Sequence, residues 1–263
     1  MENLKTRLDD RGIYYLNINR PNVMNAFDEN LIEGLDNVLS NISNNKNIRA
    51  MVLTGEGKAF SAGGDLDWMK RMANLSHDEN HKDAMKLAVM LNKLDTLPFP
   101  TIAAVNGAAF GGGVGLVSAC DIAIGNENAK FSLSEVRLGL IPATISPYVV
   151  RAVGSRNARY LFMTSSLILP EEAHHIGLLT HYTSNNNFSS LLEKNIKNIL
   201  KGGPEAIKAS KDLIFYVEDK NIDESVMTET AKRIADARAT DEGKEGTNAF
   251  LNKMKPSWQI NDK

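Results

Sequence analysis

Short apolar runs alternate with stretches of helical spacing along the first half of the chain. Apolar runs of strand length lie at 13–19, 48–54 and 101–105. Between the first two runs, apolar residues recur at helical spacing from Leu31 to Ile42, and a longer helical pattern from 65 to about 97 is interrupted by a polar stretch. Runs with little polar alternation are typical of strands that are covered on both faces. The alternation therefore predicts an α/β fold with a parallel sheet.

The pattern becomes mainly helical after Gly154. Pro204 suits the first turn of a helix, and further helices are expected over 223–239 and 241–253. We therefore expect two regions. A core over 1–200 would bind and transform the ligand, and a helical region over 201–263 would serve self-association.

Composition and charge narrow the class of protein. The chain has 263 residues, of which 43% are hydrophobic and 24% charged, as in ordinary soluble globular proteins. Net charge is −2 and the basic residues are scattered, which argues against a nucleic-acid-binding surface. The sequence has no run of about 18 apolar residues that would span a bilayer, and its first residues lack the apolar core of a signal peptide. A cytoplasmic protein without a membrane partner is expected.

Cysteine and histidine offer little chemistry. Cys120 is the only cysteine, so one chain can form neither an internal disulfide nor a thiolate cluster. Its apolar neighbours predict a buried structural thiol. His77 and His81 lie four residues apart, but they lack the glutamate-rich context of a zinc-binding helix. We expect a solvated helix face there and predict no metal site.

The strongest local signal is the run Gly107–Gly115, which holds five glycines in nine residues. Such a run implies unusual backbone torsions or close backbone approach. It lacks the terminal Gly-Lys-Ser/Thr of a phosphate-binding loop, and Leu116 or Ser118 stands where a dinucleotide fingerprint needs a small residue. Unpaired N–H groups at a helix start can hold an oxyanion, although tight helix–strand packing explains glycines equally well. The segment Lys58–Asp65 holds a corresponding position before the preceding helix.

Several ordered motifs together resemble the enoyl-CoA hydratase/isomerase (crotonase) family. They are Asn19–Ala26, Ala59–Asp65, Val105–Gly113, Cys120-Asp121, Ser134–Pro142 and Glu245–Lys253. The resemblance covers nearly the whole chain. It implies a spiral of β-β-α turns followed by C-terminal helices that build a homotrimer or homohexamer. It also implies an acyl-CoA substrate and no separate cofactor, since coenzyme A is part of the substrate.

The same resemblance implies the site residues. The backbone N–H groups of Ala62 and Gly112 are expected to form an oxyanion hole for the thioester carbonyl, and Glu135 is the expected acid–base side chain. Lys253 or Lys255 would meet the coenzyme A phosphates as simple cations. The expected substrate-binding set is Asn25, Ala26, Lys58, Ala59, Ser61, Asp65, Leu66, Gly111, Pro142 and Lys253.

One position departs from the family pattern. Hydratases of this family commonly carry two glutamates, and the position of the first is occupied here by Gly115, which cannot transfer a proton. Without the resemblance, Glu135 is more simply interpreted as a helix cap after Ser132 or Ser134. One-glutamate members of the family include double-bond isomerases and hydratases, so Gly115 does not exclude hydration.

The segment Ile145–Val149 resembles bacterial methylglutaconyl-CoA hydratases. Their substrate carries a distal carboxylate, for which Arg137, Ser146 and Tyr148 are candidates by type, although a surface salt bridge is the simpler role for Arg137. We expect hydration of a 2-enoyl-CoA, namely 3-methylglutaconyl-CoA to 3-hydroxy-3-methylglutaryl-CoA in leucine degradation. The alternatives are a 3-enoyl-CoA to 2-enoyl-CoA isomerase and a catalytically silent acyl-CoA- or RNA-binding protein.

Overall fold

The central element is a six-stranded sheet with the strand order β1-β2-β3-β5-β7-β9. The computed structural model describes residues 3–259. β1 (Leu4–Leu8) pairs antiparallel with β2 (Ile13–Ile18), and the remaining neighbours in this sheet are parallel. Parallel neighbours require crossover connections, which the helices provide. The predicted α/β class is confirmed.

Successive turns of the chain each give one strand to each of two sheets. The first strand of a pair joins the six-stranded sheet, and the second joins a three-stranded parallel sheet with the order β4-β6-β8. The pairs are β3 (Ala50–Gly55) with β4 (Ala59–Ser61), β5 (Thr101–Val105) with β6 (Ala108–Phe110), and β7 (Ile122–Asn126) with β8 (Lys130–Ser132). The strands β4 and β6 have three residues each, which is too short for a periodic sequence signal.

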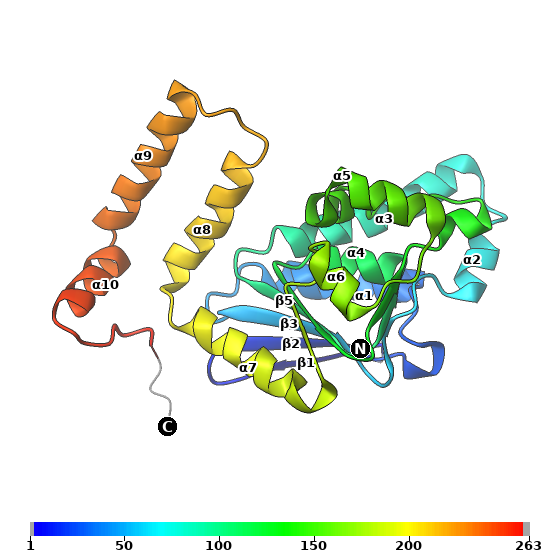
Figure 1. The fold of residues 1–263 in the computed structure, drawn as a ribbon, viewed down its shortest axis with the longest axis horizontal. Helices are drawn as coiled ribbons and strands as arrows, with labels where there is room; N and C mark the ends of the chain where they lie inside the picture. Colours follow the sequence, from blue (N-terminus) through cyan, green and yellow to red (C-terminus); the bar gives the residue numbers. More distant parts are fainter. Residues whose placement is uncertain (1–2, 260–263) are drawn as a thin grey trace.

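Alternate residues of the large sheet enter two different cores. Ala50 and Val52 face one side with Ile196 of α7 (Asn185–Leu200), whereas Met51 and Leu53 face the opposite side. That opposite core is built mainly with α1 (Glu29–Ile42), α3 (His77–Asp95) and α5 (Ser146–Thr164). Figure 1 shows α7 below the strands and the other three helices above them. Burial on both faces explains the continuous apolar runs.

Local signals set the helix starts. The Asp28 carboxylate accepts a hydrogen bond from the Leu31 N–H at 2.8 Å and so caps α1. The predicted break in the 65–97 helix is confirmed: α2 (Leu66–Met72) ends before Ser76, which begins α3 with a capping box to Glu79.

The end of the chain is helical, as predicted. α8 (Pro204–Val217), α9 (Glu224–Ala239) and α10 (Asp241–Leu251) extend away from the sheets in Figure 1. Between α6 (Pro170–His175) and α7, the short polar strand β9 (His181–Thr183) completes the large sheet, which the helical pattern after Gly154 did not predict. No helix in the part of the chain that the structure describes is both long enough and apolar enough to cross a membrane.

Candidate active site

The glycine-rich run does not form one turn but spans two connections. Gly107 closes the tight β5–β6 connection, and Gly111, with φ +48°, precedes α4 (Gly112–Ser118). A Cβ on Gly107 would overlap the Lys58 carbonyl, and one on Gly113 would lie 2.6 Å from the Ser61 carbonyl oxygen. Most of these glycines therefore serve close backbone packing, whereas Gly111 also requires a left-handed backbone.

The two glycine segments, Lys58–Asp65 and Gly107–Gly115, lie against each other. A Cβ built on Gly63 would lie 3.0 Å from the Phe110 carbonyl oxygen, and one on Gly111 would lie 3.9 Å from the Gly63 Cα. Phe27 joins both segments. Its N–H donates to Gly63 O at 2.6 Å, and its ring would lie 3.1 Å from a Cβ on Gly112. The two segments therefore meet, and each brings its own backbone N–H groups.

One of the two predicted oxyanion donors is already used within the fold. The Ala62 N–H donates to the Met24 carbonyl at 2.9 Å, so the assignment of Ala62 was wrong. Two residues later, the Gly64 N–H has no hydrogen-bond partner among residues 3–259, and the same holds for the Gly112 N–H. Gly64 and Gly112 therefore each carry a free donor, one on each of the two converging segments.

Glu135 lies beside these donors. It begins a short 3-10 helix, η2 (Glu135–Leu138), and its Oε1 would lie 3.1 Å from a Cβ on Gly111. Its Oε2 is buried without a hydrogen-bond partner in the described chain. Burial raises the pKa of the Glu135 carboxyl above its ordinary value of 4.5, and the hydrogen bond to its own backbone only partly offsets this. A buried carboxyl with one unpaired oxygen and a raised pKa is typical of an acid–base group rather than of a helix cap.

The surroundings of Gly115, on the same helix as Gly112, are apolar. Gly115 is buried in α4, one turn after Gly112, and its open side faces the side chains of Ile145 and Leu91. The space that the first of the two glutamates in the family pattern would occupy is thus filled by hydrocarbon side chains. Glu135 is left as the carboxyl group beside the free N–H groups.

Four predicted substrate-binding residues belong to the framework. The Asn25 side chain is fully buried, where it accepts from the Arg20 N–H at 2.9 Å and donates to the Ala59 carbonyl at 2.7 Å. Ser61 is equally buried and donates to the Asn25 carbonyl at 2.9 Å. Ala26 and Ala59 are also buried. None of these four side chains is available to a ligand in this arrangement, so a contact with coenzyme A at these positions would have to use backbone groups.

Some of the remaining predicted substrate-binding residues contact other parts of the chain or are buried, and others are exposed. The Asp65 carboxylate caps α2 and lies 3.1 Å from Arg20, so it holds the loop together. Pro142 is buried. In contrast, Leu66 is 72% exposed, and Lys58 and Lys253 also lie on the surface. Of this group, the exposed residues are the ones whose side chains are free to contact coenzyme A.

The three candidates for a distal carboxylate have partners within the chain. Arg137 donates to the Ser165 carbonyl at 3.0 Å rather than forming a surface salt bridge, and the Ser146 hydroxyl donates to the Ala143 carbonyl at 2.7 Å. The guanidinium of Arg151 lies 5.7 Å from the centre of the Tyr148 ring. These contacts favour none of the three as a carboxylate ligand.

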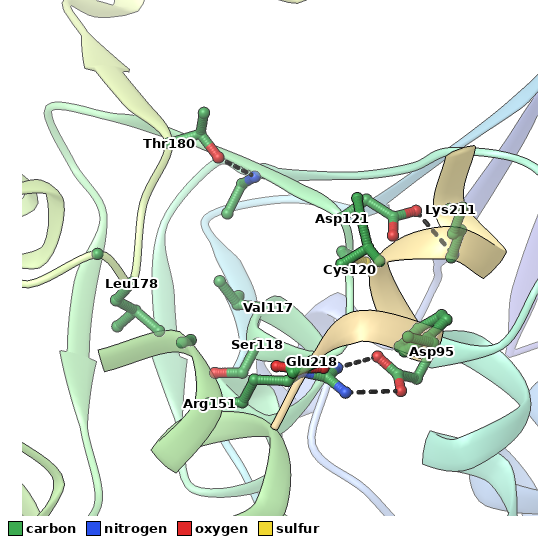
Figure 2. Close-up of a pocket in the computed structure, with 15 residues that line it drawn as sticks. Asp95, Val117, Ser118, Cys120, Asp121, Arg151, Leu178, Thr180, Lys211 and Glu218 are labelled. Atoms are coloured by element: carbon green, nitrogen blue, oxygen red, sulfur yellow. Dashed lines mark hydrogen bonds and ion pairs between the residues drawn. The ribbon is translucent and has the colours of Figure 1, made fainter. Parts of the chain in front are cut away.

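A cavity of about 320 Å³, lined by both charged and apolar side chains, lies beyond the C-terminal end of α4, between α5 and α8. Figure 2 shows its two ion pairs, Asp95 with Arg151 and Asp121 with Lys211, the second at 2.8 Å. Burial, with a smaller effect of the Asp121 charge, raises the pKa of the Cys120 thiol in this cavity to about 12. The thiol is therefore unreactive near neutral pH, which supports the predicted structural role.

The histidines show no sign of a ligand site. His77 is almost fully exposed and lies 3.5 Å from Asp78. Within residues 3–259, no three side chains of the His, Cys, Asp and Glu types gather closely enough to hold a metal ion.

Comparisons with known proteins agree with this geometry. Residues 9–261 match the family model described as enoyl-CoA hydratase/isomerase. The chain is 32% identical to the short-chain-enoyl-CoA hydratase of Clostridium acetobutylicum, over 90% of each chain. It is 30% identical to the mitochondrial methylglutaconyl-CoA hydratase of Homo sapiens, over 95% of this chain and 75% of that protein. The crystal structure of an enoyl-CoA hydratase from Shewanella pealeana superposes with a TM-score of 0.93 at 39% identity, covering 97% of this chain and 96% of that one. The chain therefore belongs to the enoyl-CoA hydratase/isomerase family.

Proposed function

We propose that this chain adds water to a 2-enoyl-CoA thioester, with Glu135 as the acid–base group. The single observation that carries the proposal is the position of the Glu135 carboxyl beside Gly111, next to the free N–H groups of Gly64 and Gly112. Addition to a conjugated thioester develops negative charge on the carbonyl oxygen. Two fixed N–H donors stabilise that charge, and the loss of one typically costs about 2.7–4 kcal/mol of barrier.

One carboxyl group suffices for both proton transfers. Ionised Glu135 accepts a proton from water while the water oxygen bonds to the β-carbon and the electrons move to the thioester oxygen. The neutral carboxyl then returns the proton to the α-carbon as the carbonyl re-forms. The net change is the addition of one water. A raised Glu135 pKa brings the two protonation states closer in energy, which suits a group that must both accept and donate.

The proposed natural substrate is 3-methylglutaconyl-CoA, which would give 3-hydroxy-3-methylglutaryl-CoA. Support comes from the Ile145–Val149 segment and from the 30% identity to the human protein named methylglutaconyl-CoA hydratase. Coenzyme A would lie along the exposed residues Lys58 and Leu66, with Lys253 toward its phosphates. Mass spectrometry of a panel of enoyl-CoA esters tests the substrate, since hydration adds one water to the thioester.

The oxyanion assignment has a matched pair of variants. Gly112 is the first residue of α4, a position that tolerates proline, so Gly112→Pro removes the N–H without breaking the helix. Gly112→Ala keeps the N–H and adds a comparable Cβ near Phe27. We expect proline to lower kcat by about 10²–10³-fold relative to alanine. Equal activity of the two variants would contradict the assignment.

A double-bond isomerase is the second candidate, favoured by the hydrocarbon that fills the Gly115 position. Conversion of a 3-enoyl-CoA to a 2-enoyl-CoA without added mass would support it. In either reaction Glu135→Gln should lower kcat by about 10²–10⁴-fold while acyl-CoA binding persists. Acyl-CoA binding without turnover of any ester would instead indicate a silent binding protein.

We also propose self-association through residues 201–263, as a homotrimer or homohexamer. Exposed apolar side chains on this region support it, because Ile222 is 87% and Phe250 83% exposed in the single chain. Sedimentation equilibrium tests the proposal: a trimer or hexamer mass agrees with it, and a monomer at micromolar concentration contradicts it.

A further inference from the structure

Phe27 holds the peptide unit that carries the free N–H of Gly64. The Phe27 N–H donates to the Gly63 carbonyl at 2.6 Å, and the Phe27 carbonyl accepts from the Asp65 N–H at 2.7 Å. Phe27 and Gly64 thereby form a parallel β-bridge. The C=O and N–H of a planar trans peptide point in opposite directions. Because the Gly63 carbonyl points at Phe27, the Gly64 N–H of the same peptide points away from the Phe27 backbone.

The side chain of Phe27 lies against the residue that carries the other free donor. A Cβ on Gly112 would lie 3.1 Å from Cε2 and 3.3 Å from Cδ2 of the Phe27 ring. The ring is 2% exposed and belongs to the main hydrophobic core, so the surrounding side chains hold it in place. One buried residue therefore contacts both donors, Gly64 through its backbone and Gly112 through its ring.

Arg20 fixes the position of Phe27 in that bridge. Its guanidinium donates to the Ala26 carbonyl at 2.5 Å and lies 2.8 Å from the Asp28 carboxylate. These two residues come directly before and directly after Phe27. The same guanidinium lies 3.1 Å from the carboxylate of Asp65, which follows the other residue of the bridge. The Arg20 side chain is only 16% exposed, so solvent ions screen these contacts little.

We propose that Phe27 is a positioning residue that sets the direction and spacing of the two oxyanion donors, Gly64 and Gly112. This inference rests on the proposed function, because it concerns the oxyanion hole of that same site. Preorganised donors stabilise a developing charge only while they keep their places, and a displacement of about 1 Å can cost roughly 10²-fold in rate. Loss of the ring should therefore slow the chemical step more than it weakens acyl-CoA binding.

The first test separates the chemical step from binding. Phe27→Leu removes the ring edge beside Gly112 and keeps an apolar side chain and the backbone bridge. It should lower kcat for crotonyl-CoA by about 10-fold or more and leave KM within about 3-fold. An unchanged kcat, or a rise in KM alone, would overturn the proposal. If the leucine variant does not fold, Phe27→Met replaces it, because methionine fills irregular core space with a flexible chain.

A second buried phenylalanine provides the matched control. Phe99 belongs to the same core and is 7% exposed, but it precedes β5, whereas the glycine run follows the end of that strand. Phe99→Leu should destabilise the fold by a similar amount and leave kcat within about 3-fold. A loss of kcat as large as that of Phe27→Leu would show a general effect of core loosening and would overturn the assignment.

A pair of substitutions tests the contact of the ring with Gly112. Gly112→Ala keeps the N–H and places a methyl group against the ring, so it should lower kcat. In the Phe27→Leu background the ring edge is absent, and the same methyl group should lower kcat by a smaller factor or partly restore it. Equal factors in the two backgrounds would overturn the proposal.

Carbonyl spectroscopy applies even if no ester is turned over. Hydrogen bonds to a thioester carbonyl lower its infrared stretching frequency, so bound butyryl-CoA, isotopically labelled at the carbonyl carbon, reports on the donors directly. The downshift seen in wild type should shrink in Phe27→Leu and persist in Phe99→Leu. Equal downshifts in wild type and Phe27→Leu, or none in wild type, would overturn the proposal. Absence of hydration with this difference intact would reject only the proposed reaction.

Discussion

The side chain of Ile145 occupies the space that a side chain on Gly115 would need. A Cβ built on Gly115 would overlap Cγ2 of Ile145 and lie 2.9 Å from its Cβ. Both residues are buried, Gly115 within α4 and Ile145 at the start of α5. The two positions are therefore energetically coupled, and the absence of a second carboxyl group is built into the packing of the core.

The coupling predicts a non-additive pair of substitutions. Gly115→Ala should destabilise the fold by about 1–3 kcal/mol through overpacking, despite the better helix propensity of alanine. Ile145→Ala alone should cost about 2–5 kcal/mol by leaving a cavity. In the double variant the new methyl group enters that cavity. The loss of stability of the double variant should therefore be smaller than the sum of the two single losses by about 1 kcal/mol or more. Urea denaturation of the four proteins measures this, and simple additivity would contradict the packing.

The raised pKa of Glu135 predicts a pH dependence of activity. The carboxylate must be ionised to accept a proton from water. kcat/KM should therefore fall as pH drops through the raised pKa, with a midpoint above the ordinary value of 4.5. A pH–rate profile on one enoyl-CoA ester checks this. A profile whose acid limb has its midpoint at or below 4.5 would show that the active carboxyl is not buried.

The raised pKa of Glu135 also predicts that the stability difference between wild type and Glu135→Gln depends on pH. Because the folded pKa is raised, the ionised form is disfavoured by folding. Wild type should lose stability relative to Glu135→Gln as pH rises from about 4.5 through the folded pKa, and the difference should then level off. A difference of about 1 kcal/mol corresponds to roughly 2–4 °C in Tm. Thermal melts of both proteins between about pH 4 and 8 measure it, and a wild-type Tm that rises relative to that of Glu135→Gln with increasing pH would contradict the sign.

The ion pair of Arg151 with Asp95 predicts a penalty for removing one partner. Asp95 is buried, and Arg151 supplies both of the hydrogen bonds to its carboxylate. Arg151→Met leaves that charge unpaired beside the cavity between α5 and α8, and we expect a loss of about 2 kcal/mol, since the guanidinium is partly exposed. Arg159→Met, at an exposed position of α5 beyond the kink at Gly154, is the control and should change stability by less than about 0.5 kcal/mol.

The hydrogen bonds of the Asn25 side chain predict that this residue stabilises the loops beside the site. It is buried with φ +57° and donates to the carbonyls of Glu56 and Ala59. Asn25→Ala would leave these acceptors and the Arg20 N–H unpaired, so a loss of about 3 kcal/mol is expected. Asn25→Asp keeps the shape but turns an acceptor toward the two carbonyls, and it should also destabilise. Chemical denaturation checks both variants; a stable aspartate variant would contradict the assigned hydrogen bonds.

The amino-acid sequence alone determined the α/β class, several helix starts and the family, because these depend on local patterns and ordered motifs. Asp28, Ser76 and Pro204 mark helix starts by their own chemistry. The glycine segments and Glu135 identify thioester chemistry by their order in the chain, and Gly115 excludes a second acid–base side chain by having none.

Only the tertiary structure decided which atoms are free to act. Ala62 and Gly64 are both small residues of one loop, but the Met24 carbonyl, 38 positions before Ala62, takes the Ala62 N–H and leaves that of Gly64. Asn25 and Ser61 are plausible ligand contacts by type, yet long-range hydrogen bonds occupy them. The contact of Ile145 with Gly115 and the unpaired indole N–H of Trp68 likewise depend on packing between distant segments. The spacing of apolar residues along the sequence does not show which buried donor lacks an acceptor.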